Sequence, residues 1–282
     1  MRFVICDVFT DRPLAGNQLA VFPDASGIPE HLLQPLAREI NFSETVFVYP
    51  PADPAHTARI RIFVPMQEIS FAGHPVLGTA TVLGAERGID DLVLETRRAP
   101  VPVRLHAGGG TMEQPLPEVE PYRHADQLLA ALDLQRSAMP IDRYDNGMPH
   151  VYVRLDSVEQ LAALRPDMNA LTELPDAFGT GFNVFAGSGT LYTNRMFAPA
   201  DGVPEDPATG SAAGPLACHL LRHGVVESGT EITISQGASV GRPSTLYATA
   251  QGAADGFSAV LVRGSAVIVA EGRFTLPGET AA

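Results

Sequence analysis

The sequence predicts a mixed α+β protein built from two similar halves, and three features of the chain support this prediction. Short apolar runs rich in Val, Ile, Phe and Tyr recur along its length, bounded by Gly, Pro and Asp, which is typical of strands. A few longer segments carry the start and stop signals of helices. A weak internal repeat places the same strand-then-helix pattern in each half.

The expected strands and helices follow one another in order along the chain. Strands are predicted at 2–9, 19–22, 45–49, 58–64, 92–95, 101–105, 150–155, 182–185, 190–198, 231–235, 245–250, 258–263 and 266–274. Helices are predicted at 29–40, 75–87, 125–133, 158–164 and 211–223. The second helix begins at Pro75 and stops at Gly88, the usual asymmetry of helix ends, while Pro35 is expected to kink or interrupt the first. Ser157 and Gln160 form a capping box for the fourth.

The internal repeat consists of residues 61–65 (RIFVP) and 195–199 (RMFAP). Each copy is followed by an acidic residue and then by a Gly that opens a helix. Both helices begin with small residues, as a helix threaded through a tight sheet requires. Because the Pro-rich segment 114–121 favours an extended connector, the predicted halves are 1–116 and 117–282, with the return of the last strand to the first half left open.

Composition restricts the class of protein. With 282 residues, 45% hydrophobic and 18% charged, the chain is long enough for about two folded domains. A formal charge of −13 without a basic cluster argues against a nucleic-acid partner and favours a small molecule. No apolar stretch reaches the roughly 20 residues of a membrane span. Met1 leads directly into a strand-like run, so we expect no signal peptide and a cytoplasmic location.

Two candidate residues for chemistry lie in the first half. Glu44 stands in the segment 41–45 (NFSET) before a strand, where a solvated loop or capping residue is the plainer interpretation. His74 follows Gly73, which lets a ligand approach the backbone closely, and the N–H groups of the next helix point at the same place. The positive helix end lowers the pKa of His74 and favours its neutral ring. A histidine that caps its own helix is the alternative.

The third candidate is the segment 205–211 (EDPATGS), which again places a carboxylate and a Gly-Ser pair at a helix start. Asp206 could act only as a helix cap, which is a common role. The repeat, however, makes Gly210 and Ser211 the counterparts of residues 73–74. Two helix N-termini that face one cleft form an anion receptor, and nearby carboxylates can move protons.

Motifs that are absent narrow the chemistry further. The sequence has no dinucleotide fingerprint and no P-loop. His219 and His223 stand at i and i+4 but lack the Glu of a metalloprotease helix, and we interpret them as surface histidines near a helix C-terminus. Cys6 and Cys218 fit no disulfide framework and are expected to be buried.

These motifs together resemble the PhzF-like family of phenazine biosynthesis. The resemblance covers the opening segment 7–17 (DVFTDRPLAGN), the glutamate segment 41–45, the helix starts at 71–80 and 205–212, and a late segment at 236–244. These segments span most of the chain in the family's order, and their combination is highly specific. One departure is Gln18, at a position where the family commonly has Pro.

The resemblance implies a diaminopimelate-epimerase-like fold, in which each half curls a sheet around a central helix and the active site lies in the cleft between the halves. It also implies a homodimer and an isomerase that works without metal or organic cofactor. In the phenazine enzymes the reaction is the isomerisation of trans-2,3-dihydro-3-hydroxyanthranilate, a small anionic cyclic substrate.

The resemblance also implies roles for individual residues. Glu44 would take a proton from C3 of the substrate and return it to C1, with support from His74 and Asp206. The substrate carboxylate region would be bound by Gly73, Gly210 and Ser211. Related racemases carry a cysteine at each helix start, and its absence here argues against two-base cysteine chemistry. Two alternatives stay open: an isomerase or epimerase of another small anionic cyclic metabolite, and a non-catalytic small-molecule binding protein.

Overall fold

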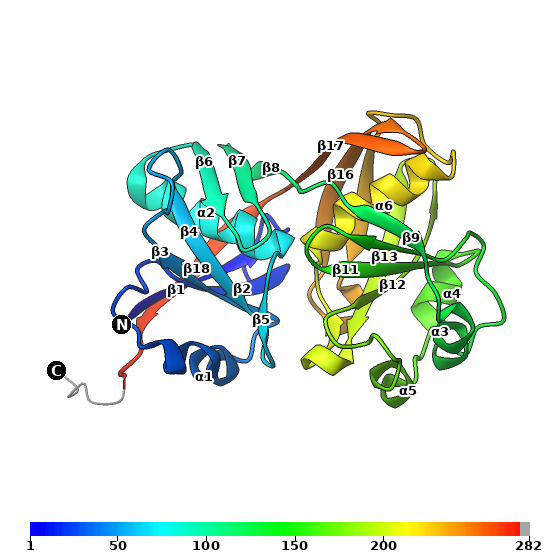
Figure 1. The fold of residues 1–282 in the computed structure, drawn as a ribbon, viewed down its shortest axis with the longest axis horizontal. Helices are drawn as coiled ribbons and strands as arrows, with labels where there is room; N and C mark the ends of the chain where they lie inside the picture. Colours follow the sequence, from blue (N-terminus) through cyan, green and yellow to red (C-terminus); the bar gives the residue numbers. More distant parts are fainter. Residues whose placement is uncertain (277–282) are drawn as a thin grey trace.

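The computed structural model describes residues 1–276, which form two lobes that lie side by side (Figure 1). The first lobe contains the helices α1 (Glu30–Ile40) and α2 (Gly73–Arg87). Its strands are β1 (Arg2–Val8), β2 (Asn17–Phe22), β3 (Glu44–Tyr49), β4 (Ala58–Phe63), β5 (Glu68–Ile69), β6 (Asp91–Glu95), β7 (Pro100–His106), β8 (Gly109–Glu113) and β18 (Ala266–Arg273).

The second lobe contains the helices α3 (Ala125–Ala131), α4 (Val158–Ala163), α5 (Met168–Thr172) and α6 (Gly210–Arg222). Its strands are β9 (Glu118–Pro121), β10 (Asp142–Asp145), β11 (Pro149–Arg154), β12 (Gly181–Ser188), β13 (Leu191–Ala198), β14 (Val203–Asp206), β15 (Glu231–Gln236), β16 (Ser244–Ala253) and β17 (Gly256–Gly264). Two single 3-10 turns, η1 (Pro199–Asp201) and η2 (Ala238–Val240), complete it.

The two lobes repeat the same sequence of strand pairings. In the first lobe β1 pairs antiparallel with β2, β2 parallel with β3, β3 antiparallel with β4, and β4 parallel with β6. In the second lobe β10, β11, β12, β13 and β15 pair in the same alternation. The predicted α+β class with two similar halves is therefore confirmed, and the repeat extends well beyond the segments that revealed it.

Equivalent contacts accompany the repeated arginines. Arg61 forms a two-pronged ion pair with Glu68 on β5, with N···O distances of 2.9 and 2.7 Å. Arg195 does the same with Glu205 on β14, at 2.9 and 2.8 Å. Each guanidinium also lies over the Phe two residues further along, at 5.3 and 5.0 Å from the ring centre. In each lobe a glutamate that follows the repeat, Glu68 or Glu205, is thus the partner of its arginine.

A central helix fills each lobe, α2 in the first and α6 in the second. Most of α2 and all but the last residue of α6 are buried. Small residues are needed where strands press against these helices. A Cβ on Gly78 would lie 2.6 Å from the Leu19 side chain, and one on Gly214 would lie 2.5 Å from that of Val260. Such approaches are sterically excluded, so the expectation of small residues is confirmed.

One strand pairing and the continuation of the chain from β17 into β18 join the lobes. β17 of the second lobe pairs with β8 of the first, and β18 then continues into the first lobe, where it pairs with β1 (Figure 1). The connector between Glu113 and Glu118 is short because residues 118–121 form β9, which pairs with β10. That pairing corrects the expectation of an extended linker over 114–121. The division at residue 116 stays a prediction.

Other expectations were confirmed or corrected by the structure. Ser157 accepts a hydrogen bond from the Gln160 backbone N–H and caps α4, as predicted. Helix α1 continues through Pro35 instead of ending there. Cys6 and Cys218 are both buried. No helix within residues 1–276 combines the length and the apolar character needed to cross a membrane.

Candidate active site

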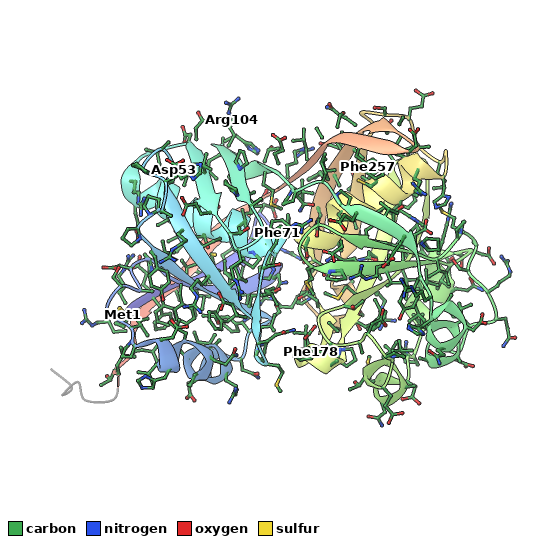
Figure 2. The ribbon with its side chains drawn as sticks, viewed as in Figure 1. Met1, Asp53, Phe71, Arg104, Phe178 and Phe257 are labelled. Carbon is green, nitrogen blue, oxygen red and sulfur yellow. The ribbon has the colours of Figure 1, made fainter. Side chains whose placement is uncertain are left out.

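The starts of the two central helices meet at the junction between the lobes. A Cβ on Gly73 would lie 2.4 Å from the carbonyl carbon of Gly210, and one on Gly210 would lie 2.9 Å from that of Gly73. Only glycine permits this contact between two backbones. Phe71, which precedes α2, lies at the same junction in Figure 2. The free N–H groups of two first turns are therefore brought together in one place.

Glu44 and His74 form a buried pair beside this junction. Glu44 is the first residue of β3 and is 7% exposed, and His74 is 1% exposed. Glu44 Oε2 lies 3.4 Å from His74 Nε2, and neither atom has a hydrogen-bond partner among the described residues. The interpretation of Glu44 as a solvated loop residue is therefore wrong. A buried polar atom without a partner is costly, so this pair is a place where a ligand or a proton is needed.

Asp206, in contrast, is fully hydrogen-bonded. Its Oδ1 accepts a hydrogen bond from Asn17 Nδ2 at 2.8 Å, and its Oδ2 accepts one from Thr209 Oγ1 at 2.6 Å. Asn17 also lies 3.2 Å from His74 Nδ1 and accepts a hydrogen bond from Ser43 Oγ at 2.8 Å. Asn17 therefore connects the residues contributed by the first lobe to the carboxylate contributed by the second.

Burial shifts the proton affinities of the site. Desolvation, followed by repulsion from Asp206, raises the pKa of Glu44 well above its ordinary value. Desolvation also raises the pKa of Asp206, against the hydrogen bonds from Thr209 and Asn17 that lower it. Desolvation lowers the pKa of His74 to about 3, so burial, ahead of the helix end that the sequence suggested, keeps its ring neutral. Neighbouring groups whose pKa values are shifted in different directions by their surroundings are suited to acid–base chemistry.

The predicted substrate-binding residues lie at the same junction, with one partner that sequence reasoning missed. Ser211, the second residue of α6, is 1% exposed, and its Oγ lies 2.9 Å from His150 Nε2. Asn17 and Ser43 were also missed as site residues, although both stand inside segments quoted for the family resemblance. His150 lies in none of those segments, and no local pattern distinguishes it.

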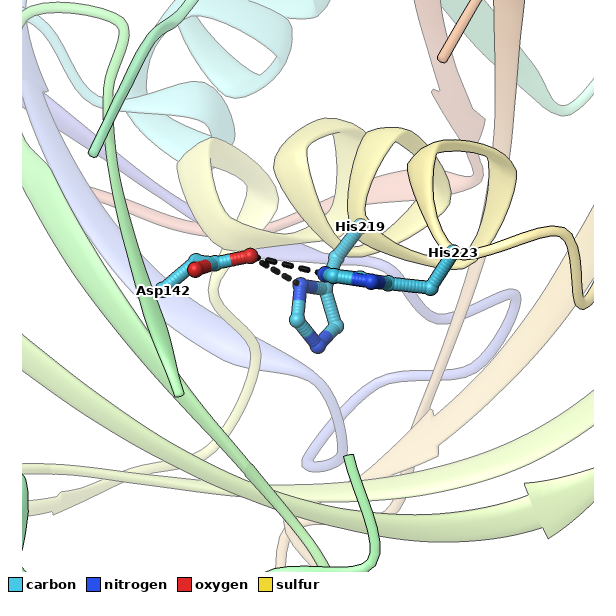
Figure 3. Close-up of side chains that lie close together, drawn as sticks. All are labelled: Asp142, His219 and His223. Atoms are coloured by element: carbon cyan, nitrogen blue, oxygen red, sulfur yellow. Dashed lines mark hydrogen bonds and ion pairs between the residues drawn. The ribbon is translucent and has the colours of Figure 1, made fainter. Parts of the chain in front are cut away.

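A second cluster of ionisable residues lies away from this junction, on the far part of α6. Asp142, His219 and His223 place one donor atom each within 4.8 Å of one another (Figure 3). His219 is fully buried, which corrects the expectation of two surface histidines. Asp142 Oδ2 lies 2.7 Å from His223 Nε2, and the Tyr144 hydroxyl lies 3.2 Å from His219 Nδ1.

Distances in this cluster favour hydrogen bonds over a metal ion. Two ligands of a tetrahedral zinc are separated by about 3.3 Å, given a bond length near 2.0 Å. The Asp142–His223 separation of 2.7 Å is shorter than this and has the length of a hydrogen bond. We interpret the cluster as a set of structural hydrogen bonds that holds the C-terminal end of α6 against β10.

The fold and the junction define a class: two-lobed, epimerase-like proteins with buried ionisable residues where two helix starts meet. Comparison with known proteins identifies the family. The model of the phenazine biosynthesis-like proteins, PhzC-PhzF, matches residues 6–272. The chain belongs to this family, as its motifs predicted.

Individual relatives agree with this assignment. A trans-2,3-dihydro-3-hydroxyanthranilate isomerase from Pseudomonas aeruginosa is 49% identical over 277 residues, which cover 96% of this chain and 98% of that protein. A solved structure described as a predicted epimerase from Pseudomonas aeruginosa superposes with a TM-score of 0.80 at 32% identity, and covers 98% of this chain and 99% of the other.

More distant structures share the fold alone. A hydroxyproline epimerase from Agrobacterium vitis superposes with a TM-score of 0.66 at 15% identity, and covers 96% of this chain and 91% of that one. The epimerase-like fold expected from the family resemblance is therefore confirmed.

Proposed function

We propose that this chain is an isomerase that converts trans-2,3-dihydro-3-hydroxyanthranilate by moving a single proton with Glu44. The observation that carries the proposal is the buried pair of unpartnered atoms, Glu44 Oε2 and His74 Nε2, which face each other at 3.4 Å. The proposed substrate is the one in the name of the isomerase that is 49% identical to this chain.

The environment of Glu44 suits a carboxylate that first removes a proton and then returns it. Because burial raises its pKa, the carboxylate is more basic than an exposed one, and the acid that it forms is weak enough to hold the proton for a time. Glu44 would take the proton from C3, and the conjugated system of the substrate would carry the charge until C1 is protonated. No atom is lost in this isomerisation.

Neutral His74 can accept or donate a hydrogen bond beside the travelling proton without adding a charge. Its pKa near 3 means that the ring stays uncharged at any ordinary assay pH. Asp206, held by Asn17 and Thr209, keeps a second negative charge close by, which raises the pKa of Glu44 further. We assign His74 and Asp206 supporting roles on this basis.

The substrate carboxylate would be held by the helix starts. Backbone N–H groups in the first turns of α2 and α6 lack intrahelical partners, and the N-terminal ends of both helices carry partial positive charge. Gly73 and Gly210 allow the two ends to approach closely. General acid–base catalysis gives about 10²–10⁴-fold in rate, so positioning in this enclosed site has to supply the rest.

Catalysis by protein side chains alone, a homodimer and a cytoplasmic location complete the proposal. All three rest on the family resemblance or on the sequence. Activity that persists after exhaustive chelation and dialysis would support the first, and light scattering of the purified protein at several concentrations would test the second.

The proposal is tested by incubating the purified protein with trans-2,3-dihydro-3-hydroxyanthranilate in D₂O. We expect the diene absorbance of the substrate to disappear and deuterium to appear at a ring carbon. The absorbance is measured spectrophotometrically, and the deuterium is detected by mass spectrometry and NMR. A sample without protein is the control for spontaneous decay. If neither conversion nor exchange exceeds that control, the chain does not act on this substrate, and an isomerase of a different cyclic anion becomes the better hypothesis.

A further inference from the structure

Ser211 is connected to a chain of buried polar side chains that the proposed mechanism does not use. His150 on β11 contacts Ser211 Oγ with its Nε2 and Asn183 Nδ2 with its Nδ1, at 2.9 and 3.3 Å. Asn183 lies on β12, which runs parallel to β11. All three side chains are 0 or 1% exposed. A network this deeply buried has to satisfy its donors and acceptors internally, so the direction of each hydrogen bond can be worked out.

The direction is set by a backbone carbonyl. Asn183 Nδ2 lies 3.2 Å from the Gly181 carbonyl oxygen, which can only accept, so this atom is the amide nitrogen of Asn183. Asn183 Oδ1 in turn accepts a hydrogen bond from Asn194 Nδ2 at 3.1 Å, consistent with the same orientation. The Asn183 amide therefore donates to His150 Nδ1, which has to be the unprotonated ring nitrogen.

The proton of the neutral ring then lies on Nε2. Burial lowers the pKa of His150 to about 3, so the ring carries one proton, and with Nδ1 accepting, that proton is on Nε2. Nε2 consequently donates to Ser211 Oγ. This direction excludes His150 as a base that activates Ser211 as a nucleophile, because such a base needs a bare Nε2.

We propose that His150 is a positioning residue that makes Ser211 a permanent hydrogen-bond donor to the carboxylate of the ligand. Once Ser211 Oγ accepts from His150, its own hydrogen is free, and within residues 1–276 the structure gives this hydroxyl no other partner. Ser211 stands in the first turn of α6, directly beside Gly210 and the meeting point with α2. A hydroxyl oriented in this way favours an acceptor-only group, which a carboxylate is and an amide N–H is not.

This inference rests on the proposed function only for the identity of the anion, so its test uses a stable probe. The probes are anthranilate (2-aminobenzoate) and its neutral analogue 2-aminobenzamide. Their binding is measured by calorimetry for the wild type, His150→Leu, Ser211→Ala and the double variant. A hydrogen bond to a charged group contributes about 1.5–3 kcal/mol, so either single change is expected to weaken anthranilate binding by roughly 10-fold or more. Binding of the neutral amide is expected to weaken less, by about 2-fold to 10-fold, because its carbonyl oxygen accepts the same hydrogen bond without a charge.

The double variant and two conservative changes separate positioning from general packing. If His150 acts through Ser211, the double variant binds anthranilate no more weakly than Ser211→Ala alone. His150→Gln keeps an amide N–H that can reach Ser211 Oγ and is expected to recover most of the affinity. His150→Asn is shorter by one methylene and is expected not to recover it. This pair keeps the test decisive even if His150→Leu does not fold.

Additive losses in the double variant, or equal anthranilate affinity in the Gln and Asn variants, would overturn the positioning role. With trans-2,3-dihydro-3-hydroxyanthranilate the same variants are expected to raise KM and leave kcat within about 2-fold, because the carboxylate is bound equally before and during proton transfer. If the wild type binds anthranilate with the expected dependence on His150 but does not turn over this substrate, the proposed reaction fails and the role of His150 stands.

Discussion

The two lobes share one pattern of strands but differ at the positions that carry chemistry. The residue across from Phe63 is Thr45, and the residue across from its repeat counterpart, Phe197, is Phe182. Glu44 of the first lobe therefore corresponds to Gly181 of the second. A Cβ at Gly181 would lie 2.6 Å from the His150 ring. The second lobe thus has no carboxylate where the first has its proposed base, and the imidazole of His150 fills the space.

At the strands that precede the central helices, the second lobe has a carboxylate and the first lobe has none at the equivalent position. Asp206 lies across from Met196, and Ile69 lies across from Ile62 at the counterpart position. Each lobe therefore contributes one carboxylate, but from different places. Among the described residues, Glu44 has an oxygen without a partner, whereas both oxygens of Asp206 are hydrogen-bonded. One open carboxyl suits removal and return of a proton by a single group, and two matched open groups would suit a two-base racemase.

The largest expected effect breaks this asymmetry at Glu44. Glu44→Gln removes the group that exchanges a proton, so we expect kcat with trans-2,3-dihydro-3-hydroxyanthranilate to fall by about 10³-fold or more. Asp206→Asn keeps one of the two oxygens that accept from Asn17 and Thr209, and its kcat is expected to fall less, by about 10-fold to 100-fold. Steady-state kinetics on both variants, with anthranilate affinity as a check of folding, provide the comparison. An active Gln variant would exclude Glu44 as the shuttle.

Much of the scaffold behind this asymmetry could be predicted from the sequence, because it depends on local patterns. The central helices were found from small residues after a Gly and from Gly88 at a helix end. Strands β5 and β10 were missed, since a two-residue strand has no period and the sequence DRYD of β10 is highly polar. Helix α5 was missed although Asp167 caps it by accepting from the Asn169 and Ala170 backbone N–H groups.

The site itself was only partly predictable, for a different reason. The candidate residues were found because each stands beside a helix or strand start, which is a local signal. Burial of Glu44 and His219, and the contact of His150 with Ser211 across 61 positions in the chain, depend on packing between elements far apart in sequence. The periodicity of a sequence does not show such contacts. The sequence therefore could not distinguish Glu44, which has an oxygen without a hydrogen-bond partner, from Asp206, whose oxygens are both hydrogen-bonded.

The second largest effect concerns the contact that joins the lobes. Gly73→Ala places a methyl group 2.4 Å from the Gly210 backbone, and the clash can be relieved only by moving the two helix starts apart. We expect a loss of about 3 kcal/mol in the free energy of unfolding, together with weaker anthranilate binding. Gly256→Ala is the matched control, since a Cβ there meets nothing within 4 Å. Equal stability of the two variants in urea melts would contradict the close contact.

The repeated arginines allow the lobes to be compared through equivalent residues. Arg195 is 9% exposed and donates to the Leu161 and Leu164 carbonyls as well as to Glu205. Arg195→Met leaves the Glu205 carboxylate, whose side chain is 11% exposed, without its ion-pair partner and two carbonyls without their donor, so we expect a loss of about 3 kcal/mol. The Arg61 side chain is 21% exposed, and Arg61→Met is expected to cost less, about 1 kcal/mol. If denaturant unfolding gives comparable losses in the free energy of unfolding for the two variants, the two arginines contribute equally to stability.

The smallest effect is the pH dependence that the Glu44 carboxyl gives to stability. The pKa of Glu44 is raised in the folded state, so the folded protein binds more protons than the unfolded chain once the pH exceeds the ordinary value near 4.5. The free energy of unfolding therefore falls as pH rises from that value to the folded pKa, by about 1.4 kcal/mol for each pH unit between the two values. Glu44→Gln removes this loss, and we expect its Tm to exceed that of the wild type by about 2 °C or more at pH 8 and by less at pH 5.

Glu227→Gln, at an exposed position on the second lobe, is the control for removing one negative charge. Calorimetry of all three proteins at both pH values makes the comparison. A Tm difference that is the same at pH 5 and pH 8 would mean that Glu44 is not held at a raised pKa. The proposed base would then lack the raised basicity on which its role depends, and the asymmetry between the lobes would lie in hydrogen bonding alone. A difference that grows with pH would show that the first lobe gives up stability to keep one carboxyl basic.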